Sequence, residues 1–230
     1  MFDRIVQDQT YHSFADGRAF LGIENAADTL SNTAFLLVGV LGLMFLWRER
    51  TASASRRFVV SEEMRAYWIL FGAVALTAFG SAYYHLAPDD ARLMWDRLPM
   101  SLGFTALLAA TVSERIRLTW GLKLLPPLVL LGAGSVIYWR WTGTLLRYAV
   151  VQYGSIATIL AIVISFRSRY AHAGRIFGVL AFYAAAKAAE ALDATIYAFG
   201  HIVSGHTLKH VLAALAAWWL LDTLKLREPR

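Results

Sequence analysis

The sequence predicts an all-α integral membrane protein, a bundle of seven transmembrane helices. Composition is the first observation: 58% of the 230 residues are hydrophobic, only 17% are charged, and the mean hydropathy is +0.49. Soluble domains carry about 25% charged residues, so a soluble domain of this length would have to bury an excess of apolar side chains. The second observation is that the apolar residues stand in continuous runs. Because a membrane β-barrel requires alternating apolar and polar residues, the runs favour helices.

The elements follow from the positions of these runs. Residues 1–27 are polar and acidic and lack a basic start followed by an apolar core, so we expect an extramembrane segment and no signal peptide. Each later apolar run is close to the ~20 residues that cross a hydrocarbon core as a helix. The runs lie at 29–47, 65–86, 96–113, 122–140, 144–166, 175–198 and 205–224. The bundle is therefore expected over 28–225, followed by a short tail at 226–230.

The basic residues orient the predicted bundle. Fourteen of the 22 Lys and Arg residues fall on one set of loops and six on the other. The richer set is Arg48, Arg50, Arg56, Arg57, Arg65, Arg115, Arg117, Lys123, Arg167, Arg169, Arg175, Lys225, Arg227 and Arg230, and the poorer set is Arg4, Arg18, Arg92, Arg97, Arg140 and Arg147. By the positive-inside rule the N-terminus is outside and the C-terminus is cytoplasmic. The net charge of +6 is thus a topology signal and does not indicate nucleic-acid binding.

Five polar residues lie near the outer ends of three spans, where such side chains are costly and suggest function. Ser81 and His85 are one helical turn apart at the end of the second span, and Asp96 opens the third. His206 and His210 are four residues apart at the start of the seventh span, and residues at this spacing share one helix face. All five are expected at one depth near the outer leaflet.

Three histidines and a water molecule suit a four-coordinate zinc ion with an open catalytic position, and the chain has no Cys to offer instead. A bound zinc ion lowers the pKa of its water towards ~7. Asp96 would accept a proton from that water and later donate it to the leaving group. Ser81 would hydrogen-bond the water or the developing oxyanion, or else only bond to its own helix. A cluster of hydrogen-bonded polar residues without metal is the alternative.

The segments around these residues resemble the alkaline ceramidase family, within the CREST superfamily of membrane hydrolases that also includes the progestin and adipoQ receptors. The similar segments are GSAYYH at 80–85, WDRLPM at 95–100, HTLKH at 206–210 and DTLSN at 28–32. The resemblance implies a seven-helix bundle with zinc held by His85, His206 and His210, and with Ser81 and Asp96 beside it. The implied reaction is hydrolysis of ceramide to a sphingoid base and a fatty acid, a step of sphingolipid metabolism.

The same resemblance implies a calcium site in the N-terminal segment. Asp16, Glu24, Asn25 and Asp28 are available, since calcium prefers several oxygen ligands. The acidic spacing and the tryptophan of the family are not reproduced, however. A solvated acidic segment with Asp28 or Ser31 near a helix start is the alternative.

A second polar cluster is expected in the sixth span. Lys187, Glu190 and Asp193 are three residues apart, which keeps them on one helix face, and Lys187 can pair with Glu190 at i, i+3. Such a cluster could also contact a substrate headgroup or support a zinc ligand. Lys209 is expected to point away from the metal, because a cation on the same face would repel zinc. Four bulky residues are candidates to shape an acyl-chain pocket, with simple packing as the alternative: Phe79, Tyr83, Tyr84 and Trp95.

The sequence therefore predicts a multi-pass membrane enzyme, a zinc-dependent amidohydrolase that cleaves a lipid amide near the non-cytoplasmic leaflet. A seven-helix receptor-like or sensor protein with a structural zinc site is an alternative of a different class. A third possibility is an ion or proton transporter that uses Lys187, Glu190 and Asp193, although no inverted repeat supports it.

Overall fold

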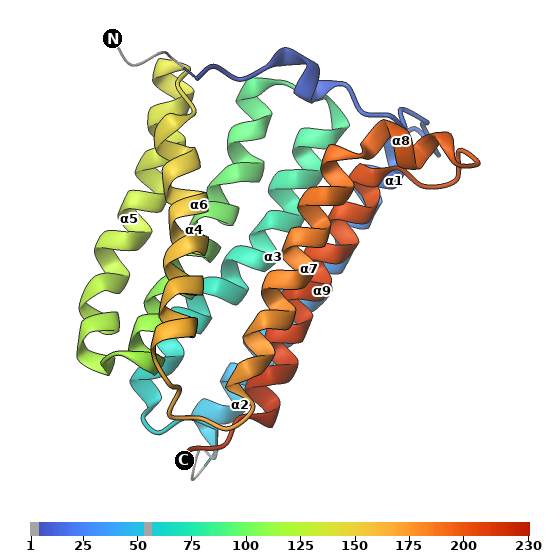
Figure 1. Ribbon diagram of the computed structural model, residues 1–230. Coiled ribbons are helices and arrows are strands. Elements are labelled where there is room, and N and C mark those ends of the chain that lie inside the picture. The colour runs from blue at the N-terminus through green and yellow to red at the C-terminus, as the bar shows by residue number, and fades with distance from the viewer. Residues whose placement is uncertain (1–4, 53–56) are drawn as a thin grey trace.

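The computed structural model describes residues 5–52 and 57–230, and all the regular elements in this part of the chain are helices (Figure 1). Arg4 and Arg56 lie outside the described residues. In chain order the helices are α1 (Ala26–Ser31), α2 (Thr33–Thr51), α3 (Met64–Leu86), α4 (Asp90–Arg115), α5 (Leu118–Thr142), α6 (Leu146–Ser165), α7 (Ile176–Ala191), α8 (Asp193–Ala198) and α9 (Gly205–Leu226). Short 3-10 turns are η1 (Gln9–His12), η2 (Ser61–Glu63) and η3 (Ala173–Arg175).

Within the described residues, four helical segments are long and apolar enough to cross a membrane. They are Ala26–Thr51, Ser61–Leu86, Leu118–Thr142 and Leu146–Ser165. Of the other long helices, α4 and α9 carry ionisable residues singled out above, which lowers their hydropathy, whereas α7 is apolar but only 16 residues long. The chain thus has the helices of a membrane protein, as its composition predicts.

The long helices run up and down through the bundle, so that the loops collect at two ends (Figure 1). The N-terminal segment, the α3–α4 and α5–α6 connections and α8 lie at one end, which we call the N-terminal end. The α4–α5 and α6–α7 connections and the C-terminus lie at the other, the C-terminal end. The described members of the two predicted sets of basic loop residues are therefore separated by the length of the bundle.

Side-chain caps determine where two of the site helices begin. The Asp89 carboxylate accepts a hydrogen bond from the Arg92 backbone N–H at 2.7 Å, so α4 starts at Asp90, earlier than predicted, and Asp96 lies in its second turn. The Ser204 hydroxyl oxygen likewise accepts from the Thr207 N–H at 3.0 Å and starts α9 where the sequence predicts it.

Two predicted spans are each divided into two helices. The first divides at Asn32, whose side-chain amide donates to the carbonyl oxygens of Asp28 at 2.8 Å and Thr29 at 3.3 Å. The sixth divides at Leu192, between α7 and α8. Both breaks lie at the N-terminal end of the bundle, next to the start of α9 (Figure 1). They supply polar backbone and side-chain groups to the histidine residues described below.

Glycine allows the close approach of the helices that carry the site. A Cβ atom at Gly80 on α3 would collide with the backbone of Trp95 on α4. Ser81 follows Gly80 and Asp96 follows Trp95, so this close contact of α3 and α4 also brings Ser81 and Asp96 near each other. The same holds at Gly205, the first residue of α9, where a Cβ would collide with the carbonyl of Ala189 on α7.

Candidate metal centre

The three predicted histidines meet at the N-terminal end of the bundle. His85 comes from the last turn of α3, and His206 and His210 come from the first turns of α9. Their ring centroids are 4.8 to 4.9 Å apart in every pair, and one nitrogen from each ring lies within 4.8 Å of the others. Among the described residues this is the single group of three or more His, Asp or Glu side chains that could share a metal ion.

The donor atoms of His85 fit a metal ligand. The residue is fully buried, and both its Nδ1 and its Nε2 atoms lack a hydrogen-bond partner. A buried polar group without a partner costs about 1–3 kcal/mol, so its presence calls for a ligand that the protein itself does not supply. His206 and His210 are 4% and 2% exposed, and an ion bound between the three rings would be shielded from solvent.

Groups outside the ring cluster hold the other two histidines. The Asp193 carboxylate, at the α7–α8 break, accepts from the backbone N–H of His206 at 2.7 Å and from that of Ala15 at 3.0 Å. The hydroxyl of Ser31, at the end of α1, is 2.8 Å from Nδ1 of His210. A bond to the second ring nitrogen, such as that between Ser31 and His210, orients a metal-ligating histidine, whereas the Asp193 bond fixes the backbone of His206.

The N-terminal segment covers the histidines. The Phe14 ring packs on His85 and His206, with centroid distances of 4.6 and 4.5 Å. His12 bonds to the Tyr84 hydroxyl at 2.8 Å and to Asp90 at 3.1 Å. Farther along the segment, hydrogen bonds from Arg18 lower the pKa of Asp16 below its usual range.

A cavity of about 570 Å³ extends from the polar end of the site into the apolar interior. Ser81, Asp96 and His210 line it together, and Ser81 lies beside the Asp96 carboxylate. Deeper in, the walls are apolar and come from α3, α4, α6, α7 and α9: Leu70, Leu107, Ile159, Val179, Ala216 and Leu220. The structure thus brings all five predicted site residues to one region, four of them 0 to 4% exposed and Asp96 5%.

The bulky residues proposed for an acyl pocket do not line this cavity. Phe79, Tyr83 and Trp95 are 62%, 47% and 51% exposed, and Tyr84 packs against the His85 ring. Phe79 and Tyr83 lie on the outward face of α3 and Trp95 is exposed near the start of α4, whereas Tyr84 is buried in packing. The cavity instead opens on the opposite side, beside positions such as Leu70 and Val74.

The second polar cluster forms, but with different members. Lys187 and Glu190 are paired, as predicted. Glu190 also accepts from Lys209 at 2.7 Å and from the Tyr11 hydroxyl at 3.0 Å. Asp193 does not join them, because the chain turns at Leu192 and carries it to His206.

Lys209 does not point away from the histidines, contrary to the prediction. Its Nζ lies 3.2 Å from Nε2 of His206. Residues three apart on a helix are neighbours, and Glu190 on α7 provides a counter-charge that holds the ammonium there. The same spacing rule that groups the two histidines could have predicted this position for Lys209.

Three of the four residues considered for calcium have partners within the protein. Asp16 is bonded to Arg18, and Asn25 donates its side-chain amide to the His85 carbonyl at 2.8 Å. One carboxylate oxygen of Asp28 accepts from Thr207 at 2.5 Å and from Ser204 at 3.2 Å. Asn25 and Asp28 therefore support the elements that carry the histidines.

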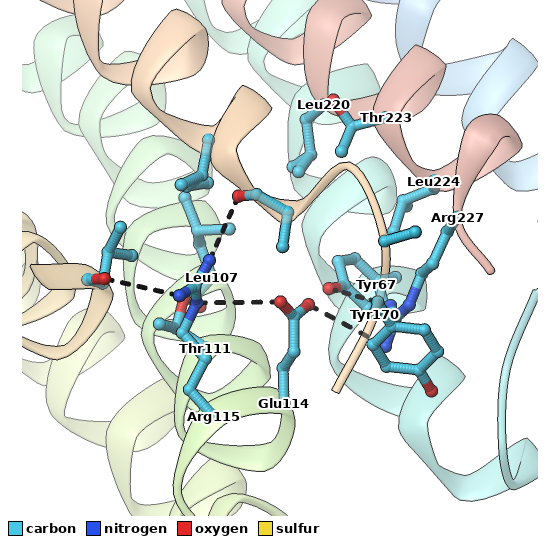
Figure 2. A pocket seen from close by; sticks show the side chains of 14 residues that line it. Tyr67, Leu107, Thr111, Glu114, Arg115, Tyr170, Leu220, Thr223, Leu224 and Arg227 are labelled. Carbon is cyan, nitrogen blue, oxygen red and sulfur yellow. Dashed lines mark hydrogen bonds and ion pairs between the residues drawn. The ribbon is translucent and has the colours of Figure 1, made fainter. Parts of the chain in front are cut away.

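A separate buried ion network occupies the C-terminal end (Figure 2). The Arg227 guanidinium bonds to Glu63 at 2.8 Å and stacks on the Tyr170 ring, whose hydroxyl donates to the same carboxylate at 2.5 Å. Burial raises the pKa of Tyr170 to about 12. The adjoining cavity is only about 40 Å³, so we assign this network to the joining of helices and not to ligand binding.

Two residues that complete the site carried no sequence signal. Phe14 and Tyr11 lie in a polar segment without periodicity, and their contacts depend on how that segment folds over the bundle. Asn25 was considered only as a calcium ligand, and its bond to the His85 carbonyl depends on the same folding. Asp193 was noticed as an intramembrane charge, but its partner is a backbone N–H that no pattern reveals.

No protein-family model matches the chain, and no curated protein is significantly similar to it. Its function has to be inferred from the chemistry of its own residues.

Proposed function

We propose that the chain is an intramembrane zinc-dependent amidohydrolase that cleaves a lipid amide. The observation that carries the proposal is a group of three buried histidines that could share a metal ion, one of which, His210, lines a long apolar cavity together with Asp96 and Ser81. A lipid amide has the matching shape, because its amide would lie at the polar end and its hydrocarbon chain in the apolar part. The resemblance to alkaline ceramidases makes ceramide the first substrate to test.

The topology proposed is seven spans with the N-terminus outside and the C-terminus cytoplasmic. The basic residues described at the C-terminal end support this orientation, and so does the smaller number at the N-terminal end. The histidines and Asp96 would then act near the non-cytoplasmic leaflet. This places the proposed reaction at the membrane face from which water can enter.

His85, His206 and His210 would hold the zinc ion, which when bound supplies a Lewis acid for the amide carbonyl and lowers the pKa of a water molecule towards ~7. The Asp96 carboxylate accepts the proton of the attacking water and passes it to the departing amine nitrogen. The Ser81 hydroxyl, beside Asp96, hydrogen-bonds the attacking water or the developing oxyanion. The C–N bond breaks, and the products are a fatty acid and an amine.

The proposal is tested on protein purified in detergent, by metal analysis and by mass spectrometry of fatty acid released from ceramide and other N-acyl amines. We expect one zinc ion per chain and release of fatty acid. Asp96→Asn should retain zinc but lower kcat by about 10²–10⁴-fold, because the proton acceptor is lost. Asp222→Asn is the matched control, since Asp222 pairs with Arg175 at the C-terminal end.

Full activity of Asp96→Asn would refute the proposed role of Asp96. Stoichiometric zinc without cleavage of any lipid amide would instead favour a receptor-like protein with a structural metal. Absence of bound zinc would remove the basis of both.

A further inference from the structure

The break between α1 and α2 creates an unusual acceptor next to the histidines. In a continuous helix the carbonyl of Asp28 would bond to the backbone N–H of Asn32, but that N–H is directed to the carbonyl of Leu30. The Asp28 carbonyl instead accepts the Ser31 hydroxyl at 2.9 Å and the Asn32 side-chain amide at 2.8 Å. The hydroxyl of Ser31 is thereby fixed in direction.

The hydroxyl also contacts a proposed metal ligand, and counting protons determines how. Ser31 Oγ lies 2.8 Å from Nδ1 of His210. A hydroxyl has one proton to donate, and the Asp28 carbonyl can only accept, so a hydrogen bond between them uses the Ser31 proton. With the proton in that bond, the serine oxygen accepts in the contact with His210, and Nδ1 carries the ring proton.

From this geometry we propose that Ser31 is a positioning residue that sets the tautomer of His210, with the proton on Nδ1 and the lone pair of Nε2 directed to the metal. Neutral imidazole binds a metal through one nitrogen, and the bond made by the other nitrogen decides which one is free. The inference rests on the proposed metal site, but it does not depend on the lipid-amide substrate.

A second set of contacts holds the turn that contains Ser31 against the start of α9. The Asp28 side chain accepts from Thr207 at 2.5 Å and from Ser204 at 3.2 Å, both at the start of α9. The backbone of Asp28 thus directs Ser31, while its carboxylate ties the same turn to the helix that carries His210. Asp28 is fully buried, so the tie is protected from water.

The experiment has two readouts that need no substrate. In metal-free full-length protein with ¹⁵N-labelled histidine, we expect the ring of His210 to be protonated at Nδ1, assigned by comparison with His210→Asn. In zinc titrations against a competing chelator, Ser31→Ala should bind zinc about 10–100-fold more weakly, the usual effect of losing such a partner. Ser31→Thr keeps the hydroxyl and should restore the affinity.

Thr33→Ala is the matched control. The Thr33 hydroxyl also donates to a main-chain carbonyl, that of Leu30 at 2.8 Å, but it is exposed and contacts no histidine. Its zinc affinity should equal that of the parent. The proposal is wrong if His210 in the parent is protonated at Nε2, or if folded Ser31→Ala binds zinc as tightly as the parent. Zinc binding that depends on Ser31 in a protein that cleaves no lipid amide would support this inference and reject only the proposed reaction.

Discussion

At the scale of single residues, His85 differs from the other two histidines. His206 and His210 have hydrogen-bonding partners within the protein, whereas the ring of His85 has none. Its position depends on packing against Phe14 and Tyr84. Burial of the His85 ring is therefore a stronger indication of a bound metal than burial of the other two rings.

Replacing His85 should remove the metal. We expect His85→Ala to lose zinc and with it any hydrolysis, because two protein ligands do not complete a four-coordinate site. Metal analysis of the purified variant tests this. His201→Asn is the control, since His201 is exposed, lies outside the cluster, and has a φ of 52° that asparagine tolerates. Full zinc occupancy in His85→Ala would exclude His85 as a ligand.

At the scale of helices, the site depends on how closely α3 approaches α4. Gly80 permits the approach, and it directly precedes Ser81. A side chain there must push Trp95 and the neighbouring Asp96 away from α3. Ser81 and Asp96 would then no longer lie side by side.

Gly80→Ala should therefore both destabilise the protein and impair the site. Overpacking of this kind costs about 1–3 kcal/mol, measured as a lower Tm in detergent. Gly72→Ala on the same helix is the control, because a Cβ there meets nothing within 4 Å. That substitution should be neutral or stabilising by up to about 1 kcal/mol, since alanine is the better helix former. Equal Tm values for the two variants would show that the α3–α4 contact can accommodate a methyl group at position 80.

Sequence patterns predicted well those helices whose ends coincide with the ends of an apolar run. The run at 65–86 corresponds to α3 at Met64–Leu86, and the run at 205–224 to α9 at Gly205–Leu226. The breaks at Asn32 and Leu192 were missed, because hydropathy locates long apolar stretches and does not detect side-chain-to-backbone bonds. The histidines were found because helical spacing is local. Phe14, Tyr11 and Ser31 were not assigned to the site, because only tertiary structure brings them to it.

At the scale of the whole molecule, two buried polar centres lie at opposite ends of the bundle, and the apolar core lies between them. Leu46, Phe71, Ala106, Ala109 and Leu221 are completely buried in that core. The network at the C-terminal end joins η2 and α4 to the α6–α7 connection and the C-terminal tail through Glu63, Glu114, Tyr170 and Arg227. Figure 2 shows the last three of these residues. We expect the two ends to respond independently to mutation.

Arg227→Ala tests this independence. It leaves the buried Glu63 carboxylate without its closest charged partner, which typically costs about 3–5 kcal/mol. The Tm should fall while zinc affinity of the folded protein stays the same. Arg230→Ala in the same tail should change stability by no more than about 0.5 kcal/mol, since that side chain is exposed. A weaker zinc affinity in folded Arg227→Ala would reveal coupling along the helices.

The covering of the histidines by the N-terminal segment affects how the protein matures. Phe14 precedes α1 in the chain, whereas His206 and His210 belong to α9, so the covered site forms only after α9 has been synthesised. An ion that enters before the segment docks is enclosed by it, and exchange then has to wait for the segment to detach. Protein matured with and without zinc should therefore persist as two slowly interconverting populations, and the metal content would record the conditions of synthesis more than those of the assay.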